Sequence, residues 1–186
     1  MDTNDDINIV FDQEGHCNYC NTYYSQKSVA PRSGEELQTE LEQIIGTIKS
    51  ERGTRKYDCI VGVSGGVDSM FVVHLLVKYG LNPLVVHYDN GWDSELAVKN
   101  IEVMLTKLKV DLNTYVNDWE EFKDLQLSFF KANVIDIELI TDQAIIAIFY
   151  KLSQKHGIKY VFTGHNVSTE SILPKHWYHW KLDGLN

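Results

Sequence analysis

The chain has 186 residues, with 17 Lys and Arg against 26 Asp and Glu, a formal net charge of −9 and a hydrophobic fraction of 44%. This apolar content excludes an intrinsically disordered chain and suffices for the core of one domain, while the acidic balance disfavours a broad nucleic-acid surface, which needs clustered Lys and Arg. The longest apolar run, residues 144–150, is far shorter than the roughly 20 residues that cross a bilayer, so we expect no membrane span.

Residues 1–32 have no sustained apolar period, and we expect them to form a small N-terminal arm ahead of one domain at 33–186. The first six residues are acidic, unlike the basic and then apolar start of a signal peptide, so we expect a cytoplasmic protein. Cys17 and Cys20 are separated by two residues, which in a reducing compartment favours a metal or redox element over a disulfide. A zinc site needs four ligands, so this pair is a candidate zinc half-site, whereas Cys59 lies in an apolar run and is expected in the core.

The elements that follow alternate between helices and strands. Ser33 before two glutamates predicts the start of an amphipathic helix at 34–50. Short apolar runs closed by Gly, Asp or Asn predict strands at 57–63, 83–88, 111–116 and 159–162. Helical spacing predicts helices at 67–79, 94–108, 118–132 and from 141 or 142 to 156.

This alternation predicts an α/β fold, a Rossmann-like parallel sheet with helices on both faces. Ligands of such sheets bind outside the carboxyl ends of the strands. Three polar loops are expected there: 64–69, 89–94 and 163–170.

The first of these loops, SGGVDS at 64–69, follows Val63 at the end of a strand and opens a helix. Glycines bring backbone N–H groups close to a ligand, and the helix N-terminus adds donors and partial positive charge, which together suit a phosphate or pyrophosphate. Ser64 and Ser69 can add hydroxyl donors, and Asp68 can hold Mg²⁺. An ordinary strand-to-helix turn also tolerates Ser and Gly, but neither the Walker-type loop nor the dinucleotide Gly-x-Gly-x-x-Gly pattern is present.

The six residues resemble the pyrophosphatase loop (PP-loop) of the ATP-pyrophosphatases, which include GMP, asparagine and NAD synthetases and the tRNA thiolation and lysidine enzymes. The resemblance implies an adenine nucleotide alpha hydrolase type of fold, and cleavage of ATP between its α- and β-phosphates with Mg²⁺. AMP goes to a carbonyl-type oxygen, and a nitrogen or sulfur nucleophile then displaces it.

Further segments in the same order resemble the N-acetyl sugar amidotransferases of lipopolysaccharide, O-antigen and nonulosonic-acid biosynthesis. The resemblance covers nearly the whole chain and rests on VHYDNGW (86–92), DWEEF (118–122), LQ (125–126), TDQAI (141–145), TGHN (163–166), TE (169–170) and ILPKHW (172–177). It implies that an acetamido group becomes an acetamidino group, through adenylation by ATP and displacement of AMP by ammonia. The implied partners are a nucleotide-activated N-acetyl sugar, a glutaminase subunit related to that of histidine biosynthesis, and a cyclase-like subunit. From the acidic net charge we expect no nucleic-acid partner.

The candidate site follows from the loop and these segments. Ser64 and Asp68 are the candidate catalytic residues, and Asp68 is also the candidate Mg²⁺ ligand. The candidate nucleotide-binding residues are Val63, Ser64, Gly65, Gly66, Asp68, Ser69, His87, Tyr88, Asp89, Gly164 and Asn166. We expect His87 and Tyr88 to contribute backbone contacts to adenine, while Asp89 has a competing interpretation as a turn former and Asp142 as a helix cap.

Other functions remain open at this point: another PP-loop ligase, a tRNA sulfurtransferase-like enzyme or a non-catalytic ATP-binding subunit. The acidic charge weighs against tRNA. Members of the resembled family are about twice as long, and a second Cys-x2-Cys commonly precedes the segment that matches residues 1–3. We therefore expect this chain to be part of a longer protein, shortened at its C-terminal end.

Overall fold

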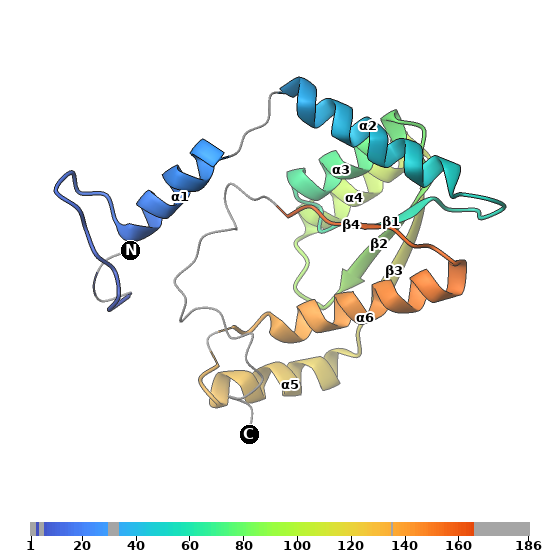
Figure 1. Cartoon of the computed structure of the whole chain (residues 1–186). Coiled ribbons are helices and arrows are strands. Elements are labelled where there is room, and N and C mark those ends of the chain that lie inside the picture. The colour runs from blue at the N-terminus through green and yellow to red at the C-terminus, as the bar shows by residue number, and fades with distance from the viewer. Residues whose placement is uncertain (1–2, 4–5, 30–33, 135, 166–186) are drawn as a thin grey trace. The chain divides into compact units, whose positions relative to one another are not determined.

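The computed structural model describes residue 3 and residues 6–29, 34–134 and 136–165 (Figure 1). The chain forms two compact units: the second is Leu41–His165, and the described residues before it belong to the first. The candidate Asn166 lies outside the described residues.

The first unit contains a tight turn followed by helix α1 (Asn18–Val29). Phe11 and Cys17 form an isolated antiparallel bridge, and the Asp12 carboxylate accepts the backbone N–H of Glu14 and of His16 within the turn. Helix α1 is not predictable from the sequence, because its polar and aromatic residues show no helical apolar period.

The second unit carries the sheet, and helix α2 (Gly34–Ser50) runs into it from the first. The strands are β1 (Cys59–Gly62), β2 (Pro83–Asp89), β3 (Asp111–Val116) and β4 (Val161–Phe162). The helices between them are α3 (Val67–Lys78), α4 (Glu95–Leu108), α5 (Trp119–Lys131) and α6 (Leu139–His156).

All four strands are parallel, in the order β3-β2-β1-β4. Ile60 of β1 pairs with Leu84 of β2 and with Val161 of β4, so β1 is central. Because the strands are parallel, their carboxyl ends meet at one edge of the sheet, where β1 continues into residues 64–69 and β2 into residues 90–94.

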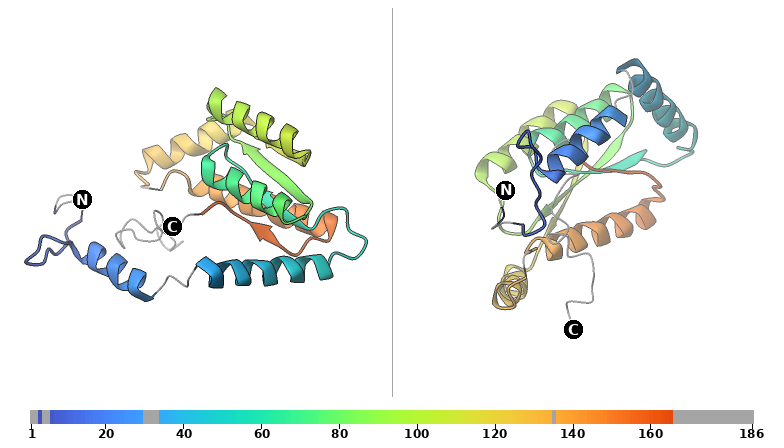
Figure 2. Two further views of the ribbon diagram at one scale, coloured as in Figure 1. Left: turned by 90° about the horizontal axis from the view of Figure 1, so that it is seen from above. Right: turned by 60° about the vertical axis from the view of Figure 1, so that its left-hand side comes forward.

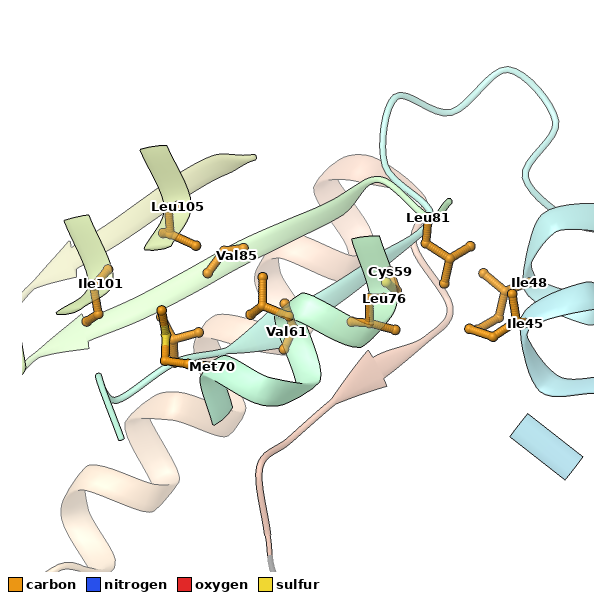
Figure 3. Close-up of a cluster of buried hydrophobic side chains, with 12 residues drawn as sticks. Ile45, Ile48, Cys59, Val61, Met70, Leu76, Leu81, Val85, Ile101 and Leu105 are labelled. Atoms are coloured by element: carbon orange, nitrogen blue, oxygen red, sulfur yellow. The ribbon is translucent and has the colours of Figure 1, made fainter. Parts of the chain in front are cut away.

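Each face of the sheet has its own apolar core. Val61 and Val85 pack with side chains of α3, α4 and the end of α2 (Figure 3). Ile60, Leu84 and Val86 point the other way and pack with Ile148 and Leu152 of α6. Helix α6 accordingly lies on the opposite side of the sheet from α3 and α4 (Figure 2).

The predicted fold class is confirmed: this is a parallel α/β sheet with helices on both faces. Strand 111–116 and helix 34–50 have the predicted bounds, and β2 extends one residue further, to Asp89. Strand β4 is shorter than predicted, because it pairs with β1 only at Val161 and Phe162. Among the described residues, no helix is both long and apolar enough to cross a membrane.

Candidate functional site

Residues 64–69 leave the central strand and are held against the start of α4. Gly65 has φ +77°, and a Cβ there would lie 2.5 Å from the carbonyl oxygen of Ala97. The Asn100 side-chain amide donates to the Gly65 carbonyl oxygen at 3.2 Å. Only glycine combines this backbone conformation with this close approach, so the position of the loop depends on Gly65.

The two serines of the loop have different surroundings. Ser69 is buried, and its hydroxyl oxygen accepts the Ser64 N–H at 3.3 Å and donates to the Gly66 carbonyl at 3.2 Å. Ser64 is exposed, with its hydroxyl oxygen 3.4 Å from that of Ser69. Ser69 therefore ties the loop together, and Ser64 is the hydroxyl that faces outward.

The N-terminus of α3 opens toward solvent. Gly66 is its N-cap residue, and no side chain caps this helix end. A Cβ on Gly66 would meet only the Ser64 hydroxyl, at 3.4 Å, so the backbone here is open to an approaching group. Asp68 lies in the first turn and is exposed. Uncapped N–H groups and the helix dipole suit a bound anion, and an exposed carboxylate beside them suits a cation that accompanies it.

The side chain of His87, near the end of β2, is buried, and both of its ring nitrogens contact other groups of the protein. Its Nδ1 lies 3.0 Å from the Val63 carbonyl oxygen, and its Nε2 lies 3.0 Å from Oδ2 of Asp93. Val63 immediately precedes the loop, so His87 joins the base of residues 64–69 to the connection between β2 and α4.

Asp89 and its neighbours form a turn after β2. The Asp89 carboxylate accepts the Gly91 N–H at 2.9 Å, as the turn-forming interpretation of this residue expects. Asn90 donates to the Thr141 hydroxyl at 3.3 Å, and the Trp92 indole N–H donates to Gln126 at 2.9 Å. These bonds anchor the turn to α5 and α6. Tyr88 is half-buried, and burial raises the pKa of its phenol.

A cavity of about 480 Å³ lies beside the end of β2, between α4 and β3. His87 and Asp89 line one end of it, and Ile101, Leu105 and Leu112 supply apolar walls. Its size falls within the range of roughly 300–1,000 Å³ typical of small-molecule pockets.

The end of β4 meets the same loop. A Cβ on Gly164 would lie 2.7 Å from the backbone nitrogen and Cα of Ser69, so Gly164 packs directly on the start of α3. His165 Nδ1 lies 2.9 Å from the Thr163 hydroxyl. Asp142, in the first turns of α6, has a raised pKa because of burial of its carboxyl and the charge of Asp136, while His165 opposes the shift.

The structure thus brings together Val63, the described loop residues, His87 and Gly164, which are candidates from three different strand ends. Asp93, Ala97 and Asn100 also support the loop, and sequence reasoning missed them. These contacts depend on how α4 packs against the loop, and no local sequence pattern predicts that packing.

Cys17 and Cys20 lie in the first unit with their sulfurs 3.4 Å apart. The Cys20 N–H donates to Cys17 Sγ at 3.4 Å, and this bond lowers the pKa of the Cys17 thiol. Within the described part of the chain, no group of three or more His, Cys, Asp or Glu side chains could hold a metal ion. A structural zinc site takes four ligands, so the described residues give no support for zinc at this pair.

Comparisons with known proteins agree with the fold and the loop. Residues 58–137 match the phosphoadenosine phosphosulfate reductase domain. The chain is 31% identical over 138 residues to an uncharacterized protein of Methanocaldococcus jannaschii, a match covering 74% of this chain and 48% of that one. It is 26% identical over 123 residues to the tRNA(Ile)-lysidine synthase of Chlamydia muridarum, covering 65% of this chain and 36% of that one. This chain therefore spans half or less of the length of these relatives.

Among solved structures, the NH3-dependent NAD synthetase of Campylobacter jejuni superposes with a TM-score of 0.51 at 14% identity, covering 70% of this chain and 57% of that one. This similarity shows the fold. The chain thus has a parallel α/β fold with a glycine-serine loop after its central strand, and the matches together support the PP-loop ATP-pyrophosphatase superfamily. The chain is related to ATP-pyrophosphatase-type ligases and synthetases, and these comparisons do not confirm the N-acetyl sugar amidotransferase family.

Proposed function

We propose that this chain is the ATP-binding domain of an amidotransferase that adenylates the acetamido oxygen of an N-acetyl sugar and lets ammonia displace the AMP. The observation that carries the proposal is the loop at residues 64–69, where an uncapped helix N-terminus, an open Gly66 and an exposed Asp68 lie together. The sugar part rests on the resemblance of the segments at 86–92, 118–122, 141–145 and 163–166.

The loop residues fit a bound triphosphate. The backbone at Gly66 has room for phosphate oxygens, and the first turn of α3 offers N–H donors that no side chain occupies. The exposed Ser64 hydroxyl adds a donor, and Asp68 would hold Mg²⁺, which supplies charge neutralisation on the phosphates when bound. A single carboxylate is typical of Mg²⁺ bound mainly through substrate phosphates and water.

The proposed reaction has two steps, in each of which one bond forms and another breaks. The amide oxygen attacks the α-phosphorus of ATP, and the α–β bridging bond breaks to release pyrophosphate. Ammonia then adds to the activated carbon. The bond from this carbon to its oxygen breaks, the oxygen leaves as part of AMP, and the surplus protons go to solvent. The product is an amidine. Adenylation helps because an amide carbonyl is a weak electrophile with a poor leaving group, so the protein mainly positions reactants and stabilises charge.

The competing superfamily functions differ in their nucleophile and acceptor. A sulfurtransferase that uses a cysteine at a strand end finds no support in Cys59, which is fully buried near the start of β1. Burial raises the pKa of its thiol to about 12, so the reactive thiolate is not formed at neutral pH. A lysidine-type function requires tRNA, and the net charge of −9 disfavours it.

The test measures pyrophosphate release from MgATP with an ammonium salt and UDP-linked acetamido sugars, one of them labelled with ¹⁸O in the acetamido carbonyl. Sugar-dependent pyrophosphate and ¹⁸O in the AMP are expected. Turnover with tRNA in place of sugar would overturn the sugar assignment. Binding of MgATP without turnover under any condition would instead make the chain a nucleotide-binding subunit, and absence of binding would remove the proposal altogether.

A further inference from the structure

The buried imidazole of His87 makes one contact on each side of its ring. The Val63 carbonyl oxygen can only accept, so Nδ1, at 3.0 Å, carries a proton and donates it. On the other side of the ring, Nε2 lies 3.0 Å from Oδ2 of Asp93.

These two contacts fix the direction of the ring, because Val63 directly follows β1 and Asp93 lies in the connection before α4. Rotation of the ring would break both bonds inside a buried space.

This link holds one side of the phosphate-binding loop. Val63 is the residue before Ser64, so the direction of the Val63 carbonyl fixes the plane of the peptide whose N–H belongs to Ser64. That N–H is held by the Ser69 hydroxyl at 3.3 Å, and the other side of the loop is held by Asn100 on the Gly65 carbonyl. The loop is therefore attached at both sides to elements that follow β2.

We propose that His87, held between the Val63 carbonyl and Asp93, is a positioning residue that sets residues 64–66 in the orientation that receives the ATP phosphates. It acts through Val63 and does not need to touch the nucleotide with its side chain. This role rests on the proposed function, because it assumes that the loop binds MgATP.

The positioning role is tested by MgATP binding to two variants. In His87→Asn, the side-chain amide nitrogen lies near the position of Nδ1 and can still donate to Val63, whereas in His87→Gln the amide reaches toward Asp93. We expect the Kd for MgATP to rise about tenfold in His87→Gln and by no more than about twofold in His87→Asn. The matched control is His74→Gln on α3, outside the loop, which should bind like the wild type.

A merely structural role predicts a different result. Both variants lose the same buried ring, so both would unfold at similarly lower temperature and bind MgATP equally. Equal Kd values in the two variants would therefore overturn the positioning role. Failure of the wild type to bind MgATP would remove the proposed function and this role with it.

Discussion

Three helices follow strands of this sheet, and they begin in two different ways. Helix α4 is capped by Ser94, whose hydroxyl accepts the Ala97 N–H at 3.1 Å, and α5 by Asp118, whose carboxylate accepts the N–H groups of Glu120 and Glu121. The N-cap residue of helix α3 is Gly66, which has no side chain to accept these N–H groups. The caps satisfy donors from within the chain, whereas the uncapped start leaves its donors for a ligand.

Helix α6 shows that a missing cap alone is not a binding site. Its N-cap residue, Glu138, makes no side-chain bond to the helix, and the titratable groups nearby are the carboxylates of Asp136 and Asp142 and the imidazole of His165. The two carboxylates repel a phosphate. At α3 the uncapped end comes with an open glycine backbone and a serine hydroxyl, and this combination distinguishes it from α6.

The largest expected effect is the difference in stability between alanine substitutions at the two loop glycines. Gly65→Ala places a methyl group 2.5 Å from the Ala97 carbonyl oxygen at φ +77°, and we expect it to destabilise the fold by about 2–3 kcal/mol. Gly66→Ala has space and an ordinary φ of −78°, so stability should change by less than about 0.5 kcal/mol. Urea unfolding measures both.

Gly66→Ala should nevertheless weaken MgATP binding, because its methyl group occupies the open side of the loop. Calorimetric titration checks this. If Gly66→Ala bound MgATP like the wild type, the open backbone at the start of α3 would not be the phosphate site.

The next effect concerns the exposed carboxylate in the first turn of α3. Asp68→Asn keeps the size of the side chain and removes the charge proposed to hold Mg²⁺, so turnover of MgATP should fall about 100-fold while stability stays close to the wild type. Pyrophosphate release measures the loss. Asp124→Asn, at an exposed position of α5, is the matched control. Equal activity of the two variants would contradict the role of Asp68.

The sequence predicted most elements of the second unit because each has a strong local pattern. Strand 111–116 and helix 34–50 have the expected bounds, since the strand-forming Thr, Tyr and Val of the one and the apolar stripe of the other are readable without tertiary context. Helix α1 lacks such a stripe and was missed. Strand β4 ends up with two residues because its length depends on pairing with β1, which no local pattern encodes.

The site was predictable to the extent that it is continuous in sequence. Residues 64–69 could be identified from their position between a strand and a helix, but the contacts that hold them come from distant segments. His87 was expected to present its backbone to adenine, whereas its ring contacts Val63 and Asp93. Gly164 against Ser69 likewise depends on the neighbouring position of β1 and β4.

Removal of a cap should affect stability and leave binding alone. Asp118→Ala takes away the acceptor of two N–H groups at the start of α5, and we expect a loss of about 1 kcal/mol in the free energy of unfolding. The Kd for MgATP should stay within about twofold of the wild type. Urea unfolding and titration calorimetry measure the two quantities. A large loss of binding with little loss of stability would mean that α5 contributes directly to the site.

The smallest effect is expected at the uncapped start of α6. Burial and the charge of Asp136 raise the pKa of Asp142 above its ordinary value of 3.8, so the folded state holds this proton more tightly than the unfolded chain does. Ionisation of Asp142 therefore costs stability, and the cost is fully present above the raised pKa and vanishes as the pH falls below 3.8. Asp142→Asn should consequently raise the urea midpoint slightly at neutral pH and leave it unchanged in acid below that value. The substitution also removes a negative charge from this helix end. We nevertheless expect that MgATP binding at α3 does not improve with it. A gain in binding would mean that the carboxylates at the start of α6 repel the nucleotide, and the two uncapped helix ends would then act on one ligand.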